Sequence, residues 1–401
     1  MTRLATEREV DPRALGVAPA AVARIWDAVE RLYRSGMHPA IAVCVRCRGG
    51  VLLDRAIGHA SGNGPDDPPD APKRVVTPDT PFTTLSASKP VAAMMIHLLA
   101  ERGLLHLDDP VAEYIPEFAQ HRKHGITIRH LLVHRAGLAF LPPEVLELDR
   151  LADPARVLET ICDIRPVFRP GRTLAYHALS SGFIMAELVR RLLGKDIRAF
   201  VDEVLCWPLG LRWMNFGVAP ADVGLVARNY FTGPPIPAVA RALFRRVLGV
   251  DFEQVPPMSN DPRFLTGIIP SANLVATANE MSIFYQLLLE GGALGGVRVF
   301  DARTVYRATH EQTYMEFDRA LGLPIRYSLG FMLGARWLSL YGPGTGRAFG
   351  HLGFTNVITW ADPRRRVAAA ILTSGKPLLY PGLYDLIDIP RQIGLACPPI
   401  T

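Results

Sequence analysis

The chain has 401 residues, of which 49% are hydrophobic, and a formal net charge of +6. This length and composition allow one large core or two lobes, and length alone favours two structural units. The positive charge is spread over single arginines and short clusters such as Arg364-Arg365-Arg366, without aromatic residues between them or a sustained basic helix face. That distribution argues against a nucleic-acid-binding protein.

The ends of the chain and its cysteines indicate a compartment. Residues 1–12 contain no apolar segment of the signal-peptide type, and nowhere do about eighteen uncharged apolar residues follow one another. The sequence therefore predicts no membrane span and a cytoplasmic protein. The cysteines fit that compartment, because they are odd in number and mostly lie in apolar segments.

Two residue pairs have spacings found in metal sites. Cys44 and Cys47 resemble a redox or zinc half-site, but they lie in a strand-like run, where residues three apart point to opposite faces. His130 and His134 have helical ligand spacing, yet no acidic residue between them and no third ligand completes a site. The sequence predicts core thiols, no metal and no cofactor.

Predicted strands stand at both ends of the chain and predicted helices in the middle. The expected helices are 19–35, 91–100, one within 104–118 that starts at Asp108-Asp109-Pro110, most of 142–265, a helix beginning at Thr277, and 383–395. The expected strands are 41–45, 51–56, 328–337, 347–351, 357–360 and 367–372, and 58–80 is expected to be a loop rich in Gly, Pro and Asp.

This order of elements predicts a mixed α/β (α+β) fold. An antiparallel sheet is built from N- and C-terminal segments and flanked by helices, and a mainly helical lobe is inserted into it. By this division, residues 1–85 and 266–401 form the sheet lobe, and residues 86–265 form the helical lobe. Residues 218–265 have little periodic pattern and are expected to line a pocket for substrate.

Ser86 and Lys89 form a Ser-x-x-Lys motif directly before the apolar run of 91–100. Residues three apart at the start of a helix share a face, so the hydroxyl and the amine can meet there. A partly desolvated helix N-terminus favours a neutral amine and a developing negative charge on oxygen, which is chemistry for an activated serine. A chance tetrapeptide with a lysine reaching toward solvent is the alternative. Because Pro90 is tolerated only in the first turn, Ser86 and Lys89 must lie there.

A catalytic serine also needs a proton relay and an oxyanion hole, which distant segments can supply. Tyr176 lies on a loop just before a predicted helix, and a core tyrosine is the alternative interpretation. Gly350-His351-Leu352-Gly353 closes a late strand, where a glycine lets backbone amides approach a ligand. The alternative interpretation is that His351 is only a residue of the turn at the end of that strand.

Several further segments occur in the same order as the motifs of a known family. Besides Ser86-x-x-Lys89 and Tyr176, they are Ile126 to Leu138, Pro270-Ser271-Ala272-Asn273-Leu274, His351-Leu352-Gly353 and Trp360-Ala361-Asp362-Pro363. With them the chain resembles the serine β-lactamase and penicillin-recognising superfamily, specifically its class C-like and family VIII carboxylesterase branch. The resemblance runs along most of the chain and implies the β-lactamase/transpeptidase-like fold, with the active site between the lobes.

The resemblance also implies roles for single residues. Ser86 takes the place of the nucleophile, Lys89 that of its neighbouring base, and Tyr176 that of the hydroxyl that relays a proton to the leaving group and activates water. The backbone amides of Ser86 and Phe354 take the place of the oxyanion hole. His351-Leu352-Gly353 stands where the family has Lys-Thr-Gly.

Departures from the family pattern bear on the substrate. His351 is at best partly charged near neutral pH, whereas the lysine of Lys-Thr-Gly supplies a permanent cation for the carboxylate of penicillins. Ala178 replaces the usual Asn, so an amide donor is missing, and His177 either takes over that polar contact or packs as a loop histidine. Neither Glu144 nor Glu147 sits in a class A-like deacylation motif.

These departures favour esters over β-lactams. The sequence predicts a serine hydrolase that cleaves small carboxylic esters through an acyl-enzyme on Ser86, without metal or organic cofactor. The same chemistry on a β-lactam, a D-amino peptide or an amide, or acyl transfer to an alcohol or amine, stays open. A sensor protein that is acylated without turnover is a third alternative. The predicted partner is a small molecule, and no prediction of oligomeric state or acyl length follows.

Overall fold

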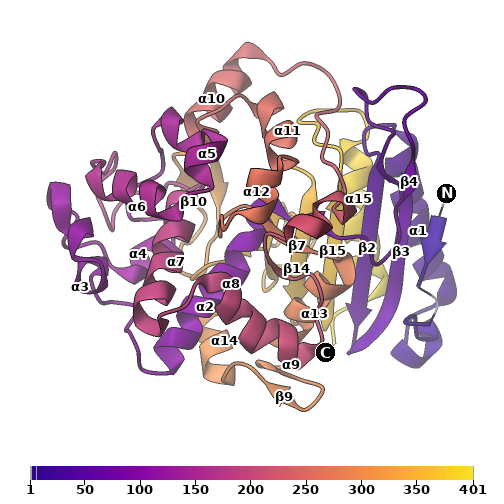
Figure 1. Cartoon of the computed structure of the whole chain (residues 1–401). Coiled ribbons are helices and arrows are strands. Elements are labelled where there is room, and N and C mark those ends of the chain that lie inside the picture. Colours follow the sequence, from indigo (N-terminus) through magenta and orange to yellow (C-terminus); the bar gives the residue numbers. More distant parts are fainter. Residues whose placement is uncertain (1, 6, 401) are drawn as a thin grey trace.

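The computed structural model describes residues 2–5 and 7–400. Its centre is an eight-stranded antiparallel sheet in the order β1-β3-β2-β15-β14-β13-β12, with β4 paired to β3 (Figure 1). The strands of this sheet are β1 Thr2–Leu4, β2 Ala40–Cys47, β3 Gly50–Ser61, β4 Arg74–Val75, β12 Met332–Leu333, β13 Phe349–Gly353, β14 Val357–Asp362 and β15 Val367–Thr373. The smaller sheets are formed by β5 Phe82–Thr83, β6 Asn215–Phe216 and β7 Leu274–Ala276, by β8 Ala293–Leu294 and β9 Val297–Arg298, and by β10 Glu316–Asp318 and β11 Leu323–Ile325.

Helices cover the sheet and fill the inserted region (Figure 1). They are α1 Pro19–Arg34, α2 Lys89–Glu101, α3 Val111–Tyr114, α4 Ile128–Leu132, α5 Leu148–Leu151, α6 Pro154–Asp163, α7 Ser180–Leu193, α8 Ile197–Val201, α9 Trp207–Leu209, α10 Ala238–Leu248, α11 Val255–Ser259, α12 Pro262–Thr266, α13 Ala278–Leu289, α14 Ala302–Thr309 and α15 Leu383–Ala396. The predicted mixed fold, with a sheet made from both ends of the chain, is confirmed.

The central strand β15 joins the two ends of the chain. It pairs with β2 on one side and β14 on the other, so an N-terminal strand and the C-terminal strands share one sheet. Every residue of β15 is buried, and successive residues alternate between two cores. Because both faces are covered, the strand is an uninterrupted apolar run rather than an alternating one. Helices α1 and α15 pack on one face, and α13 packs on the other.

The long amphipathic helices lie where their apolar spacing predicts them. Helix α1 spans Pro19–Arg34, α13 begins after Thr277, and α15 spans Leu383–Ala396. Thr277 caps α13 because its side chain accepts from the Glu280 amide while the Glu280 carboxylate accepts from the Thr277 amide.

Three expectations about shorter elements were wrong. The predicted strand over 328–337 shrinks to β12, because Gly330 takes a φ of +112° and turns the chain just before it. The loop predicted over 58–80 begins later, since β3 continues to Ser61 and pairs with β4. The helix expected within 104–118 does start after Asp108-Asp109-Pro110, but it is only the single turn of α3, because Pro116 starts a separate 3-10 segment.

The cysteines are confirmed as buried free thiols. Cys44 points into the core on the α13 side of the sheet and Cys47 into the core on the α1 and α15 side. Opposite faces are what three-residue spacing along a strand gives.

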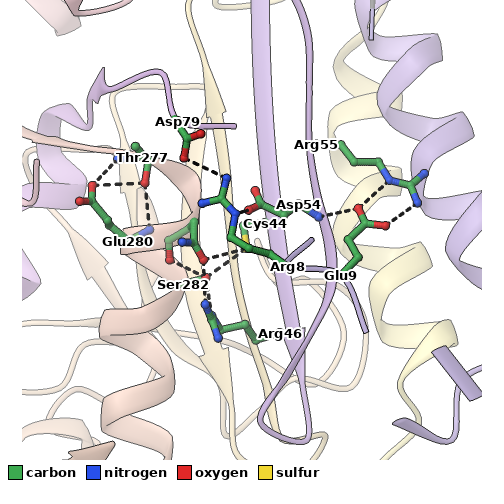
Figure 2. A network of polar contacts seen from close by, with 11 residues as sticks. Arg8, Glu9, Cys44, Arg46, Asp54, Arg55, Asp79, Thr277, Glu280 and Ser282 are labelled. Carbon is green, nitrogen blue, oxygen red and sulfur yellow. Dashed lines mark hydrogen bonds and ion pairs between the residues drawn. The ribbon is translucent and has the colours of Figure 1, made fainter. Parts of the chain in front are cut away.

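Charged side chains fix the N-terminal segment to β3 (Figure 2). The Arg8 guanidinium lies 3.0 Å from the carboxylate of the buried Asp54 and 2.9 Å from that of Asp79. Glu9 pairs with Arg55 at 2.8 Å and also accepts from the Asp54 amide. Burial raises the pKa of Asp54 to about 7, and the neighbouring Arg8 acts in the opposite direction.

Within residues 2–5 and 7–400, no helix combines the length and the apolar character needed to cross a bilayer.

Candidate active site

Ser86 lies on the 3-10 turn Leu85–Ser88, which runs directly into α2. Pro90 sits in the first turn of that helix, as the sequence requires. Leu85 has a φ of +50°, a conformation that costs a branched side chain about 1–3 kcal/mol and persists only where its surroundings hold it. Ser88 stabilises this conformation, because its hydroxyl donates to the Leu85 carbonyl and accepts from the Leu274 amide at 3.0 Å. The turn therefore presents a half-buried Ser86 from a fixed backbone.

Lys89 is buried and its Nζ donates to three oxygens. These are Ser86 Oγ at 3.1 Å, the Ala178 carbonyl at 2.8 Å and the Ser271 carbonyl at 3.0 Å. Burial places the pKa of Lys89 well below its usual value, so the neutral amine becomes accessible. An amine that touches the Ser86 hydroxyl and is fixed by two carbonyls can accept the hydroxyl proton.

Tyr176 lies on the other side of Lys89, with its ring centroid 4.8 Å from Nζ. Burial raises the pKa of Tyr176 above its usual range, and the adjacent Ser86 hydroxyl acts in the opposite direction. The phenol is therefore protonated at neutral pH and can donate. Ser86 and Lys89, three residues apart, thus meet Tyr176 from a distant segment of the chain.

Asp318, at the end of β10, holds the backbone of Tyr176 in place. Its buried carboxylate accepts from the amides of Tyr176 at 3.1 Å, Ala320 at 2.9 Å and Leu321 at 3.0 Å. The other oxygen of the carboxylate accepts from the Tyr327 hydroxyl at 3.2 Å. Four donors on one carboxylate make a rigid connection between the hairpin and the tyrosine loop.

His134 fills the space between these groups. Its ring lies 4.7 Å from the Tyr176 ring and 5.0 Å from the Tyr327 ring, centroid to centroid. Its Nδ1 accepts from the His177 amide at 3.2 Å, so that nitrogen carries no proton. Burial, together with the nearby ring of His177, sets the pKa of His134 well below its usual value. A neutral imidazole therefore packs behind Tyr176.

His177 is fully buried. Neither of its ring nitrogens has a hydrogen-bond partner among the described residues. Burial, aided by Lys89, lowers the pKa of His177 to about 3, so the side chain is neutral. The next residue, Ala178, contributes its carbonyl to Lys89 in place of any side-chain contact.

His351, Leu352 and Gly353 lie on β13, which faces the Ser86 turn. A Cβ placed on Gly353 would lie 2.0 Å from the Thr84 carbonyl oxygen, so only glycine allows the strand this close to the serine segment. His351 is buried, and burial lowers its pKa to about 3. Its Nδ1 donates to the Leu352 carbonyl at 2.7 Å, which leaves Nε2 as a bare acceptor.

Phe354 follows with a φ of +54°. Its ring stacks on Phe252 at 4.2 Å between centroids, and Phe252 in turn lies 4.9 Å from Phe244 of α10. The segment 218–265 thus contributes an aromatic wall beside the strand end. Leu85, His134 and Phe354 all have left-handed backbone conformations and all lie at this site.

Sequence reasoning missed several residues that shape the site. Asp318 and Tyr327 lie in segments without a motif, and nothing in their local pattern marks them. Phe252 lies in the segment 218–265 that was expected to line a pocket, but no pattern marks that residue itself. Ser271 lies in a quoted motif, and the contact of its carbonyl with Lys89 could have been sought there. His134 lies in the quoted segment Ile126 to Leu138, but the only individual role weighed for it was that of a metal ligand, and no group of three or more possible ligands occurs in the described parts of the chain.

The comparisons with known proteins agree with this geometry. The sequence model of the family described as Beta-lactamase matches residues 28–387. "Esterase/beta-lactamase LipL" of Mycobacterium tuberculosis is 30% identical over 336 residues, which cover 77% of this chain and 74% of that protein.

Solved structures show the same fold. The crystal structure of a penicillin-binding protein homolog from Caulobacter crescentus has a TM-score of 0.78 at 25% identity, covering 95% of this chain and 98% of that one. The crystal structure of a family VIII carboxylesterase has a TM-score of 0.77 at 26% identity, covering 93% of this chain and 97% of that one. The predicted resemblance is confirmed: this chain belongs to the beta-lactamase family and is an enzyme of the serine hydrolase class.

Proposed function

We propose that this protein hydrolyses small carboxylic esters through an acyl-enzyme on Ser86. The observation that carries the proposal is the contact of Ser86 Oγ with a buried Lys89 whose other acceptors are two backbone carbonyls. The relatives described as esterases and the family VIII carboxylesterase structure support the same reaction class.

In the proposed first step, neutral Lys89 removes the Ser86 proton while Oγ attacks the ester carbonyl carbon. The carbonyl oxygen becomes an oxyanion facing the backbone amides of Ser86 and Phe354, each contributing about 3 kcal/mol. The proton passes from Lys89 through Tyr176 to the departing alkoxide, which leaves as an alcohol. In the second step, water gives a proton to the Tyr176 oxygen while the Tyr176 hydroxyl passes its own proton to the neutral Lys89 amine, and the resulting hydroxide attacks the acyl carbon. The acid is released when the bond to Ser86 Oγ breaks, and Oγ takes its proton back from Lys89.

Ester specificity rests on His351. In the family's Lys-Thr-Gly, a permanent cation faces the substrate carboxylate, whereas the imidazole here is neutral because it is buried. A neutral acceptor gives an anionic β-lactam no charge pairing, and Ala178 gives its acylamino group no amide donor. The site therefore favours uncharged esters over β-lactams, amides and D-amino peptides.

The decisive experiment is intact-protein mass spectrometry combined with turnover of short p-nitrophenyl esters. We expect multiple turnovers for the wild type, a transient acyl mass on the protein, and loss of both in Ser86→Ala. Unchanged activity in that variant would remove Ser86 from the mechanism. A stable adduct without turnover would identify an acyl-binding sensor, and faster hydrolysis of a chromogenic cephalosporin than of the esters would identify a β-lactamase.

A further inference from the structure

Phe354 is the residue of the β13–β14 turn whose amide takes the place of an oxyanion donor in the proposed mechanism. It follows Gly353, the last residue of β13, and its φ of +54° lies in the left-handed region. A residue with a side chain is disfavoured there and persists only where its surroundings hold it. Among residues 2–5 and 7–400, no group accepts a hydrogen bond from the Phe354 amide. The amide is therefore free to donate to a substrate as long as the backbone keeps this conformation.

Polar contacts fix the residues that follow Phe354. The Thr355 hydroxyl and the Asn356 side-chain amide both donate to the Pro377 carbonyl, at 3.0 and 2.8 Å. The side-chain oxygen of Asn356 accepts from the Tyr380 hydroxyl at 2.9 Å. On the preceding side, β13 pairs with β14 and packs against the 3-10 turn that leads into α2. These contacts hold both neighbours of Phe354, but none of them involves Phe354 itself.

The side chain of Phe354 is held by Phe252. The two rings lie 26° from parallel, with their centroids 4.2 Å apart. Phe252 is fully buried, and the rings of Phe244 and Phe231 stand edge-on to it at 4.9 and 6.2 Å. Stacked and edge-to-face arrangements are the favourable ones for aromatic pairs. Phe252 thus offers a well-packed flat surface on which the Phe354 ring lies.

Local contacts also fix the backbone that carries Phe252. The Asp251 amide donates to the Gln254 side chain at 3.1 Å, and the Gln254 amide donates to the Asp251 carbonyl at 3.0 Å. These bonds close the short 3-10 turn Phe252–Gln254. Arg245 of α10 pairs with the Asp251 carboxylate at 2.6 Å. The Phe252 ring therefore has a defined place relative to the β13–β14 turn.

We propose that Phe252 is a positioning residue for the oxyanion hole. Its ring holds the Phe354 ring and so keeps the Phe354 amide in the conformation that directs it toward the substrate carbonyl oxygen. This inference rests on the proposed ester hydrolysis through Ser86, in which that amide stabilises the oxyanion. An oxyanion donor acts only when it lies about 3 Å from the oxygen of the transition state. Loss of the stacking surface should therefore slow the chemical step and leave substrate binding nearly unchanged.

The first test measures kcat and KM for p-nitrophenyl acetate in Phe252→Leu, which keeps most of the buried volume and removes the flat surface. We expect kcat to fall about tenfold and KM to change less than about twofold. Phe118→Leu is the matched control, because Phe118 is also fully buried but lies in the 3-10 segment Pro116–Arg122. This control should lose a similar amount of stability in urea and keep kcat within about twofold.

A double-mutant cycle tests whether Phe252 acts through the Phe354 ring. Phe354→Gly removes that ring, and glycine adopts the left-handed conformation without steric cost. Adding Phe252→Leu to Phe354→Gly should change kcat less than about twofold, because no ring remains to be held. A loss of about tenfold in both backgrounds would overturn the inference, since Phe252 would then act independently of Phe354.

The remaining outcomes separate this inference from the proposed function. An equal loss of kcat in Phe118→Leu and Phe252→Leu would overturn the positioning role, because lost core packing would explain both. A change in KM alone would also overturn it and would place Phe252 in the wall of the substrate pocket. Unchanged kinetics in Phe252→Leu, with Ser86-dependent turnover in the wild type, would refute the positioning role and leave the ester hydrolase standing. Absence of Ser86-dependent turnover in the wild type would overturn both.

Discussion

Lys89 and Lys376 are two buried lysines whose pKa values are both lowered, but their surroundings differ. Lys89 in the candidate active site and Lys376 beyond the end of β15 are both almost inaccessible to solvent, and burial is the cause of the lowered pKa in each. Lys89 donates to two carbonyls and to the Ser86 hydroxyl, whereas Lys376 donates to the Thr373 carbonyl. The pKa of Lys376 falls to about 7.

The two lysines differ in whether a side-chain hydroxyl lies within hydrogen-bond distance of the amine. A lowered lysine pKa is common to both places, so it does not by itself identify a catalytic base. An amine becomes a base for catalysis when a group whose proton must leave lies within hydrogen-bond distance, and Ser86 provides that group only for Lys89. Around Lys376, the polar groups of His38, Tyr380 and Asn356 bond one another and hold the turn between β13 and β14.

We expect the largest effect on activity when Lys89, rather than Lys376, is replaced by methionine. Lys89→Met should lower kcat for a short ester by about 10²- to 10⁴-fold, because it removes the proton acceptor of Ser86. Lys376→Met, a matched change at a second buried lysine, should cost less than about tenfold, since no reacting group is near it. Steady-state kinetics with circular dichroism of both variants checks this. A similar loss in both would show that burial, rather than the contact with Ser86, governs activity.

Asp318 tests whether the tyrosine opposite Lys89 must be held in place. Asp318→Asn should lower kcat about tenfold with little change in KM, because the neutral amide accepts the Tyr176 amide more weakly and Asp318 touches no substrate. Asp318→Ala should cost more, since no acceptor remains for three backbone amides. The pH profile of kcat gives the second readout. If Asp318→Asn changed KM alone, the carboxylate would act on substrate binding and not on Tyr176.

The smallest expected effect is the contribution of Lys376 to the pH dependence of the free energy of unfolding. The folded-state pKa of Lys376, about 7, lies below the unfolded value near 10.5, so between these values the unfolded chain binds the extra proton. Stability contributed by this group therefore rises with pH, by about 1–2 kcal/mol between pH 7.0 and 8.5.

Urea unfolding at the two pH values, for wild type and Lys376→Met, isolates that contribution. At the higher pH, the wild type should gain free energy of unfolding relative to Lys376→Met. The contribution of Lys89 is the same in both proteins and cancels from the difference. A constant difference would mean that Lys376 keeps its ordinary pKa and is hydrated in the folded state.

The sequence predicted much of the architecture where a pattern repeats over many residues. Helices α1, α13 and α15 follow from apolar spacing and caps, and the buried β15 follows from its uninterrupted apolar run. Short elements were predicted poorly. A two-residue strand such as β12 exists because β13 lies beside it, and no local preference distinguishes it from the glycine-flanked loop around it.

By itself, the sequence determined the serine, the lysine three residues later, and the requirement from Pro90 that the motif stand at the start of a helix; Lys89 is the first residue of α2, while Ser86 lies on the 3-10 turn just before it. That follows from local geometry, because the spacing and the proline act within one turn of chain. Only the tertiary structure decided that Lys89 is buried against the carbonyls of Ala178 and Ser271 and that His351 is neutral. It also decided that Asp318, rather than a nearby motif residue, fixes Tyr176. Burial and long-range contacts set these protonation states, and both arise only when distant segments pack together.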